Sequence, residues 1–265
     1  PLTVIADQLG VPREELPTFR RWTEGFVAQL GGMDDLQRQV EAAQMIVEFP
    51  HNFAAKLEER RKDPQDDINT DNDHATVEDE KPLVVPECLS ILQQLLVAGN
   101  ETTESAIAEG MALLIRNPDQ LALVLGDLSL VPNLVEEVLR LATPTANMWR
   151  VTTKDAELGG VKIAAGSMCL LRYAGANRDP KVFPDPDRMD IQRENLGDHI
   201  AFGAGIHFCV GAALARKEMQ TAFHSLLSRF EGFRFQADAP APVHPPNILL
   251  WGFDSLPIEL TPRAS

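Results

Sequence analysis

The sequence predicts a mainly α-helical protein with small antiparallel β-sheets. Apolar residues recur at helical spacing up to about residue 145 and again over about 209–230. Between about 146 and 208, apolar and polar residues alternate and a Gly-Gly pair marks a turn, as in an antiparallel hairpin. The tail, 231–265, is rich in proline and aliphatic residues, which favours short strands. We expect one domain over 1–265, because this length can bury a substantial core.

Composition excludes several classes of function. The formal net charge of −15 argues against a nucleic-acid partner, because binding to phosphates needs clustered Lys and Arg. No apolar run approaches the roughly 20 residues of a membrane span, and no signal peptide opens the chain. The cysteines Cys88, Cys169 and Cys209 are too few and too scattered for a disulfide framework. We therefore expect a soluble, cytoplasmic protein without a membrane partner.

Two early segments have helical spacing and end at Gly10 and Gly31. Their apolar positions are Val4, Ile5 and Leu9, then Phe19, Trp22, Phe26 and Leu30. A long helix should follow over about 33–61, although Pro50 should break or kink it. The segment 63–82 is rich in Asp, Asn and Glu and predicts an exposed loop.

A further helix is expected from near Pro86 to just before Pro118. In its middle, the run 98–103 reads Ala-Gly-Asn-Glu-Thr-Thr. Glycine costs a helix about 1 kcal/mol relative to alanine, and threonine hydroxyls can bend a helix by bonding to the preceding turn. A local rule broken in a core element suggests a functional site. Gly99 could equally serve close helix packing.

Shorter helices are expected after Pro118 and near Pro132. In the second, Glu137 and Arg140 stand three residues apart on one face and can pair, although such pairs are common on exposed helices. The strands expected next lie in the segments NMWRVTT, AELGGVKIAAGS and MCLLRYAGANRDP.

Cys209 follows a glycine-broken loop and precedes a stretch with helical spacing. Gly203 and Gly205 let the backbone take positive φ and approach a flat ligand closely. The thiol should lie beside the unpaired N–H groups at the helix start, which favours a thiolate that can bind a metal. A cysteine in such a place is also often a small buried apolar residue.

The array Phe202-Gly203-x-Gly205-x-His207-x-Cys209-x-Gly211 resembles the haem-binding signature of the cytochrome P-450 family. The resemblance implies haem b as cofactor, with Cys209 as the iron ligand and Phe202 shielding its sulfur. His207 and Arg150 would contact the haem propionates, although by composition both could be surface residues. The cofactor-binding residues implied in this region are Arg150, Phe202, Gly203, His207, Cys209 and Gly211.

The run from Ala98 to Thr103 resembles the family's oxygen-activation motif, which places Ala98 and Gly99 at the cofactor. In that motif Gly99 would give dioxygen room, Thr102 would hydrogen-bond it and Glu101 would supply protons. Glu137 and Arg140 resemble the family's E-x-x-R element. With Arg188 from the downstream proline-rich bend, they would form a structural clamp behind the haem.

The resemblance implies a haem-thiolate monooxygenase that hydroxylates a small organic substrate with dioxygen. Electrons would come from a separate ferredoxin or flavodoxin, and Ile248 to Trp251 could approach the substrate. Complete relatives carry a considerable additional N-terminal part, so the implied fold is a cytochrome P-450 fold that is N-terminally incomplete. The alternative is a truncated, catalytically impaired relative that binds haem or a partner. Peroxide-driven oxidation is a third alternative, which the pair Glu101 and Thr102 disfavours.

Overall fold

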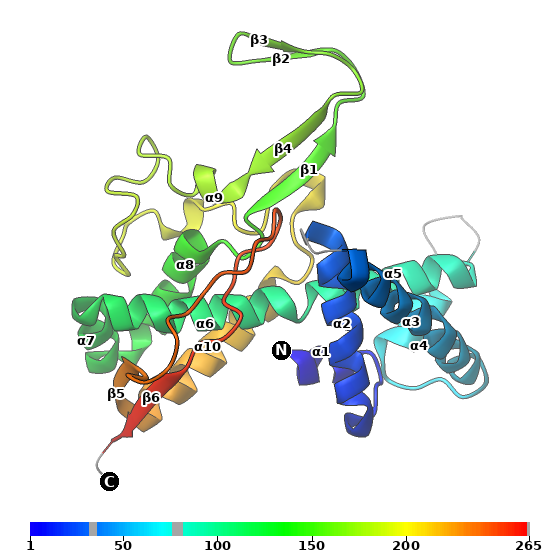
Figure 1. Cartoon of the computed structure of the whole chain (residues 1–265), viewed down its shortest axis with the longest axis horizontal. Coiled ribbons are helices and arrows are strands. Elements are labelled where there is room, and N and C mark those ends of the chain that lie inside the picture. Colours follow the sequence, from blue (N-terminus) through cyan, green and yellow to red (C-terminus); the bar gives the residue numbers. More distant parts are fainter. Residues whose placement is uncertain (32–35, 76–81, 264–265) are drawn as a thin grey trace. The chain divides into compact units, whose positions relative to one another are not determined.

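The computed structural model describes residues 1–31, 36–75 and 82–263. The chain divides into two compact units, Pro1–Glu104 and Ser105–Ser265 (Figure 1). The described strands form three two-stranded antiparallel pairs, and helices make up most of the remaining regular structure. The predicted fold class, mainly α with small antiparallel sheets, is confirmed. None of the helices in the described ranges combines the length and apolar character needed to cross a membrane.

The α-helices described in the first unit are α1 (Leu2–Gln8), α2 (Leu16–Gly31), α3 (Leu36–Lys62), α4 (Ile68–His74) and α5 (Val85–Ala98). Their apolar faces meet in one core, whose centre is aromatic. The Trp22 ring meets Phe49 edge-on with centroids 5.7 Å apart, and Phe49 stacks on Phe53 at 4.5 Å. The helical spacing of the early segments therefore predicted this core correctly. Gly10, which was expected to end the first segment, follows α1 with a φ of 58°.

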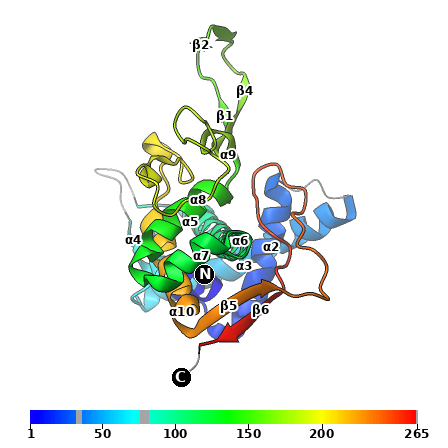
Figure 2. The same ribbon diagram turned by 90° about the vertical axis from the view of Figure 1, so that its left-hand side faces the viewer.

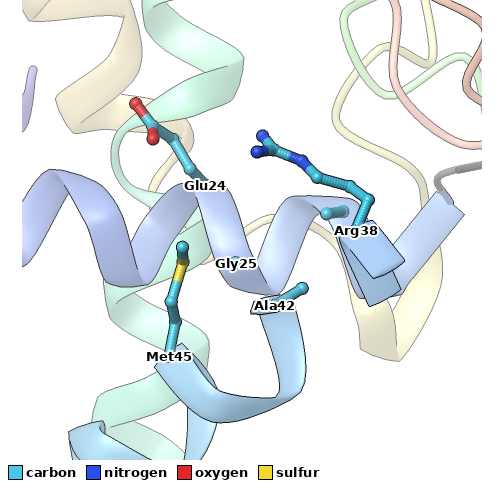
Figure 3. A pocket seen from close by; sticks show the side chains of 6 residues that line it. Glu24, Gly25, Arg38, Ala42 and Met45 are labelled. Atoms are coloured by element: carbon cyan, nitrogen blue, oxygen red, sulfur yellow. The ribbon is translucent and has the colours of Figure 1, made fainter. Parts of the chain in front are cut away.

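The helices α2 and α3 approach each other closely at Gly25, where Figure 3 shows Ala42 and Met45 of α3 facing the glycine. A Cβ atom on Gly25 would lie 2.9 Å from the Met45 Cβ atom and 3.3 Å from the Ala42 carbonyl oxygen. No side chain fits at such distances without a shift of its neighbours. Glycine is therefore required here by packing.

The structure corrects one part of the expectation for α3. Of the predicted break or kink at Pro50, the break does not occur, because α3 continues through Pro50 from Leu36 to Lys62. Its neighbour Phe49 and, one turn away, Phe53 are fully buried, so core packing holds the helix where one backbone hydrogen bond is lost. Residues 33–35 of the expected helix lie outside the described ranges.

The acidic segment is not simply an exposed loop, because it contains α4. Asp67 caps this helix by accepting a hydrogen bond from the Thr70 backbone N–H. Asn69 is fully buried and donates to the Leu9 carbonyl oxygen at 2.6 Å, and the buried Asn72 donates to that of Cys88 at 3.1 Å. These polar residues satisfy backbone groups inside the unit. The remainder of the segment, 76–81, lies outside the described residues.

The single helix expected between Pro86 and Pro118 is in fact two. α5 ends at Ala98, and α6 (Glu101–Arg116) begins after Gly99 and Asn100. Gly99 and the threonines at 102 and 103 are the residues that predicted a bend. The irregularity was predicted correctly, but it is an interruption between two helices.

The second unit packs helices around its own core. Its remaining helices are α7 (Pro118–Gly126), α8 (Val131–Ala142), the short α9 (Tyr173–Ala176) and α10 (Ala212–Arg229). α6, α8 and α10 come together at Gly110, where an added Cβ atom would lie 2.4 Å from the Phe223 Cζ atom. Helices were therefore expected in the right places, because the 3.6-residue apolar period is strong in these segments.

The strands of this unit also follow the predicted pattern. β1 (Asn147–Val151) pairs with β4 (Met168–Arg172), and β2 (Ala156–Leu158) pairs with β3 (Val161–Ile163) through the turn Gly159-Gly160. β5 (Phe230–Phe235) pairs with β6 (Ile258–Pro262). Within this unit the β2–β3 hairpin and the β5–β6 pair lie at opposite ends (Figures 1 and 2).

The segment between β5 and β6 is irregular and is held by several contacts to the rest of the unit. His244 stacks on Trp251 with ring centroids 4.1 Å apart, and its Nε2 atom lies 2.5 Å from the Glu109 Oε1 atom of α6. An isolated bridge also joins Leu250 to Thr145. Aromatic stacking and one buried carboxylate therefore place a segment in which the sequence showed no chemistry.

Candidate functional site

The loop from Phe202 to Gly211 presents Cys209 at the entrance to α10. Gly203 and Gly205 both adopt a φ of 71°, the left-handed region in which side chains other than glycine are strained. The Cys209 backbone N–H donates to the Phe202 carbonyl oxygen at 3.0 Å, which closes the loop on itself. Gly211 then caps α10. The two glycines and this hydrogen bond fix the backbone from which the thiol projects.

The rim around Cys209 is apolar and open within the second unit. Cys209 is half-buried, while Ile206, Phe208 and Val210 are 97%, 53% and 92% exposed. A Cβ atom on Gly205 would meet no other atom within 4 Å. Exposed apolar residues gathered in one loop are characteristic of a surface that binds a ligand or another part of a protein.

No group of three or more His, Cys, Asp and Glu in the described residues could hold a metal ion. Cys209 therefore offers one soft thiolate ligand, which suits an iron whose other ligands belong to a porphyrin. The open backbone at Gly205 leaves space for a flat group, and the apolar rim matches its faces. The residues present fit a haem.

A half-buried ion pair connects α8 and α10 next to Phe202. The Arg216 Nε and Nη2 atoms of α10 donate to the Glu136 carboxylate of α8 at 2.7 and 2.9 Å. His199 Nε2 lies 3.0 Å from the same carboxylate, and the Arg216 Cζ atom stands 4.6 Å from the Phe202 ring centroid. The side chain of Phe202 packs against the core of the unit. These contacts join two core helices to the residue that begins the loop.

The electrostatics of this cluster are unusual. Burial alone would raise the pKa of Glu136, but the hydrogen bonds from His199 and Arg216, with their charges, outweigh it and lower the pKa from 4.5 to about 2. The hydrogen bond to Glu136 is the main cause that raises the pKa of Arg216. Burial opposes it, and the negative charges of Glu136 and Cys209 add to the rise. Both members of the pair therefore remain charged over a wide pH range.

The E-x-x-R pair is fully buried. Arg140 Nε and Nη2 each donate to the Glu137 carboxylate at 2.8 Å, and its Nη1 atom donates to the carbonyl oxygens of Asn177 and Pro186. The third arginine is Arg193, whose Nε atom lies 3.5 Å from Glu137 Oε1.

The prediction that the Arg188 side chain joins Glu137 and Arg140 was wrong. Arg188 contributes its carbonyl oxygen, which accepts hydrogen bonds from both Arg140 and Arg193. The proline-rich bend brings the Arg188 backbone to the pair, and Arg193, five residues further on, supplies the guanidinium.

The run 98–103 is placed in the first unit at the interruption between α5 and α6. Thr102 Oγ1 donates to the Ala98 carbonyl oxygen at 3.0 Å, so the hydroxyl bonds back to the preceding turn as predicted. A Cβ atom on Gly99 would lie 2.9 Å from Ile5, which supports the interpretation that this glycine serves close packing. Burial, reinforced by Glu104 and Glu24 against the effect of Arg20, raises the pKa of Glu101.

The two propionate candidates are in the second unit. Arg150 lies on β1 opposite Cys169, and its Nη1 atom donates to the Trp149 carbonyl oxygen at 2.8 Å. His207 is exposed in the Cys loop. Over the described residues, neither side chain forms an ion pair or a hydrogen bond to another side chain. Their donors are available to a bound anion.

Sequence reasoning missed Glu136, His199, Arg193 and Arg216. Arg216 is seven residues after Cys209, two helical turns along the chain, and this spacing was a readable signal. Glu136 immediately precedes Glu137, so a paired-glutamate signal was present as well. The contacts of His199 and Arg193 depend on irregular backbone, which has no periodic pattern to read.

Comparison with known proteins finds the Cytochrome P450 family model matching residues 33–252. The chain is 38% identical over 260 residues to 6-deoxyerythronolide B hydroxylase of Saccharopolyspora erythraea, covering 98% of this chain and 63% of the relative. It is 36% identical over 266 residues to steroid C26-monooxygenase of Mycobacterium tuberculosis, covering 99% and 65%. The chain thus spans less than two thirds of these relatives.

Solved structures agree with these sequence relatives. Cytochrome P450 CYP109Q5 from Chondromyces apiculatus superposes with a TM-score of 0.87 at 39% identity, covering 100% of this chain and 64% of that one. P450BioI in complex with an acyl carrier protein ligated to hexadec-9Z-enoic acid gives 0.90 at 30% identity, covering 98% and 65%.

Proposed function

Since the chain belongs to the cytochrome P450 family, whose members bind haem b, we propose that the whole protein is a haem-thiolate monooxygenase. It would hydroxylate a small organic substrate with dioxygen. The observation that carries the proposal is the loop at Cys209, in which two left-handed glycines present one thiol beneath an open, apolar rim. When bound, the haem supplies dioxygen activation, and a thiolate ligand favours O–O cleavage.

The residues of the second unit would bind and orient the cofactor. Cys209 Sγ would hold the iron, and Phe202, which packs against the core, would shield the sulfur. A Cβ atom on Gly211 would lie in ordinary contact with the sulfur, at 3.9 Å, whereas one on Gly203 would face the Tyr173 hydroxyl at 3.5 Å. Arg150 and His207 would hold the two propionates by charge and hydrogen bonds.

The residues at 98–102 would manage protons. Thr102 Oγ1 is oriented by its hydrogen bond to the Ala98 carbonyl oxygen. The raised pKa of Glu101 makes its carboxyl a better proton donor near neutral pH. We propose that Glu101 delivers protons from solvent and that Thr102 positions them.

The electron donor we propose is a separate ferredoxin or flavodoxin, as for bacterial members of the family. Names of relatives specify 6-deoxyerythronolide B and steroids as their substrates, so an apolar organic molecule is the class we propose. The cytoplasm is the proposed location, supported by three scattered cysteines in the sequence.

The test is spectroscopic. The wild-type chain is purified with haem or reconstituted, reduced under carbon monoxide and examined for the absorption band of thiolate-ligated haem. Cys209→Ser should abolish that band, because an alcohol does not replace the thiolate. Cys169→Ser, a half-buried cysteine on β4, is the matched control and should keep it. Absence of the band in wild type, both native and reconstituted, would refute the proposal.

A second candidate is a haem-binding or partner-binding protein without turnover. The exposure of Ile206 and Val210 favours it, since an open rim admits water to the iron site and weakens coupling of oxygen to substrate. Substrate oxidation with a surrogate redox couple separates the two functions. Haem-loaded protein that yields no product with a panel of apolar substrates supports the second candidate.

A further inference from the structure

Glu136 and Arg216 form an ion pair for which the proposed oxidation has no direct use. We propose that Arg216 is a positioning residue for Cys209: Glu136 fixes its guanidinium against Phe202, where its positive charge offsets that of the thiolate and raises the reduction potential of the bound haem. This inference rests on the proposed function, because it requires Cys209 to hold iron.

Contacts connect the ion pair to the thiol in two steps. The guanidinium is held by two hydrogen bonds to one carboxylate, 2.7 and 2.9 Å long, which fix its plane as well as its position. Its Cζ atom lies 4.6 Å from the ring centroid of Phe202. The carbonyl oxygen of Phe202 accepts the Cys209 N–H at 3.0 Å. Arg216 therefore stabilises the residue on which the Cys209 backbone depends.

The positive end of the pair faces the Cys loop. Arg216 contacts Phe202, whose carbonyl oxygen accepts the Cys209 N–H, whereas the Glu136 carboxylate is held by Arg216 and His199. The charge of Cys209 also contributes to the raised pKa of Arg216. The nearer charge dominates the field at Cys209, because Coulomb energy falls with distance. A positive charge near a thiolate reduces electron donation to the iron, and such outer contacts tune the potential of metal sites.

Burial distinguishes this pair from ordinary surface ion pairs. The side chains of Glu136, Arg216 and His199 are 20%, 32% and 1% exposed. Those of Arg234 and Glu259, which pair on the β5–β6 sheet, are 78% and 40% exposed. Solvent screens the second pair more strongly than the first. A charge effect on the haem is therefore expected from Arg216.

The experiment measures the reduction potential of haem-loaded protein and the hydrogen exchange of the Cys209 amide in the haem-free chain. Arg216→Gln removes the positive charge and the two paired hydrogen-bond donors. Arg216→Lys keeps the positive charge but cannot make the two parallel hydrogen bonds to the Glu136 carboxylate. Lys217→Gln removes one positive charge from an exposed neighbour on the same helix and is the control. The double variant Glu136→Gln/Arg216→Met leaves no unpaired carboxylate, so it serves if Arg216→Gln does not fold.

Arg216→Gln should lower the reduction potential of the haem and speed hydrogen exchange of the Cys209 amide. Both values for Arg216→Lys should fall between those of Arg216→Gln and wild type. Lys217→Gln should match wild type. The double variant should also lower the potential. A purely structural role would change thermal stability and leave the potential of folded variants unchanged, and that result overturns the inference. If wild type itself lacks a thiolate-ligated haem, the proposed function fails. A wild type that has it, with unchanged potentials in the variants, refutes the inference alone.

Discussion

Single residues in this protein carry charge into its interior: Glu137 and Arg140 are fully buried, and the neighbouring Glu136 is half-buried. Its carboxylate is held by Arg216 and His199 between two helices of the second core. Sequence could predict Cys209 and its glycines, because their spacing is local, and it could predict Glu137 with Arg140 for the same reason. It could not predict that Arg193 replaces Arg188, since that choice depends on the path of an irregular bend.

The first prediction concerns stability in acid. The pKa of Glu136 is about 2 in the folded protein against an ordinary value of 4.5, so its contribution is complete above pH 4.5 and is lost as the pH falls toward 2. At ~1.4 kcal/mol per pKa unit, the whole effect is roughly 3 kcal/mol, of which about 1 kcal/mol disappears between pH 6 and pH 3.5. Urea unfolding of wild type and Glu136→Gln at both pH values measures it.

The difference in unfolding free energy between these two proteins should shrink at the lower pH. Glu194→Gln is the control, because Glu194 is exposed and forms no ion pair with the described residues. Its difference from wild type should stay constant within error. A Glu136→Gln difference that is equally large at both pH values would show that the paired carboxylate does not provide the stability.

At the scale of elements, the sequence predicted the positions of the helices better than their interruptions. The periodic spacing of apolar residues predicted α2, α8 and α10 with ends close to those observed, because the apolar residues of a helix face that packs in a core must recur about every 3.6 residues. Local rules failed where packing overrides them. Pro50 stays inside α3, and the acidic segment forms α4 because Asn69 and Asn72 find backbone partners in the core.

The second prediction concerns the contact of α6 with α8 and α10. Gly110→Ala should destabilise the protein although alanine favours helices by about 1 kcal/mol, since overpacking a core costs about 1–3 kcal/mol. The added methyl would lie 2.4 Å from Phe223 and 3.0 Å from Val138. We expect a lower melting temperature by calorimetry.

Two further variants complete that experiment. Gly126→Ala in α7 is the matched control, because a Cβ atom there meets nothing within 4 Å, and it should leave the melting temperature equal or raised. Phe223→Leu in the Gly110→Ala protein should recover part of the loss by making room for the methyl. If Gly110→Ala is as stable as wild type, close helix packing does not explain this glycine.

For the whole molecule, net charge is a property that can be calculated from the sequence alone. The net charge of −15 makes the folded chain repel itself at neutral pH. The identity of the family also followed from a few spaced motifs, and the family model confirms it over 33–252. The division into two cores, Pro1–Glu104 and Ser105–Ser265, had no such signal, because its boundary falls inside the continuous helix α6.

The third prediction follows from that charge. Raising sodium chloride from about 0.01 to 0.15 M shortens the screening length from about 30 to 8 Å and should raise the melting temperature at pH 7. The same addition near the isoelectric point of about 4.8 should have little effect, because the net repulsion is absent there. Equal effects of salt at the two pH values would contradict this explanation.

The β2–β3 hairpin stands apart from the core of the second unit (Figure 1). Leu158 and Val161 are 74% and 64% exposed, and the turn at Gly159 and Gly160 has no atom within 4 Å of either added Cβ position. Exposed turns with small residues are where inserted sequence is tolerated best. For protein engineering, this turn is the place to graft an affinity peptide or a fluorophore attachment site while the Cys loop stays untouched.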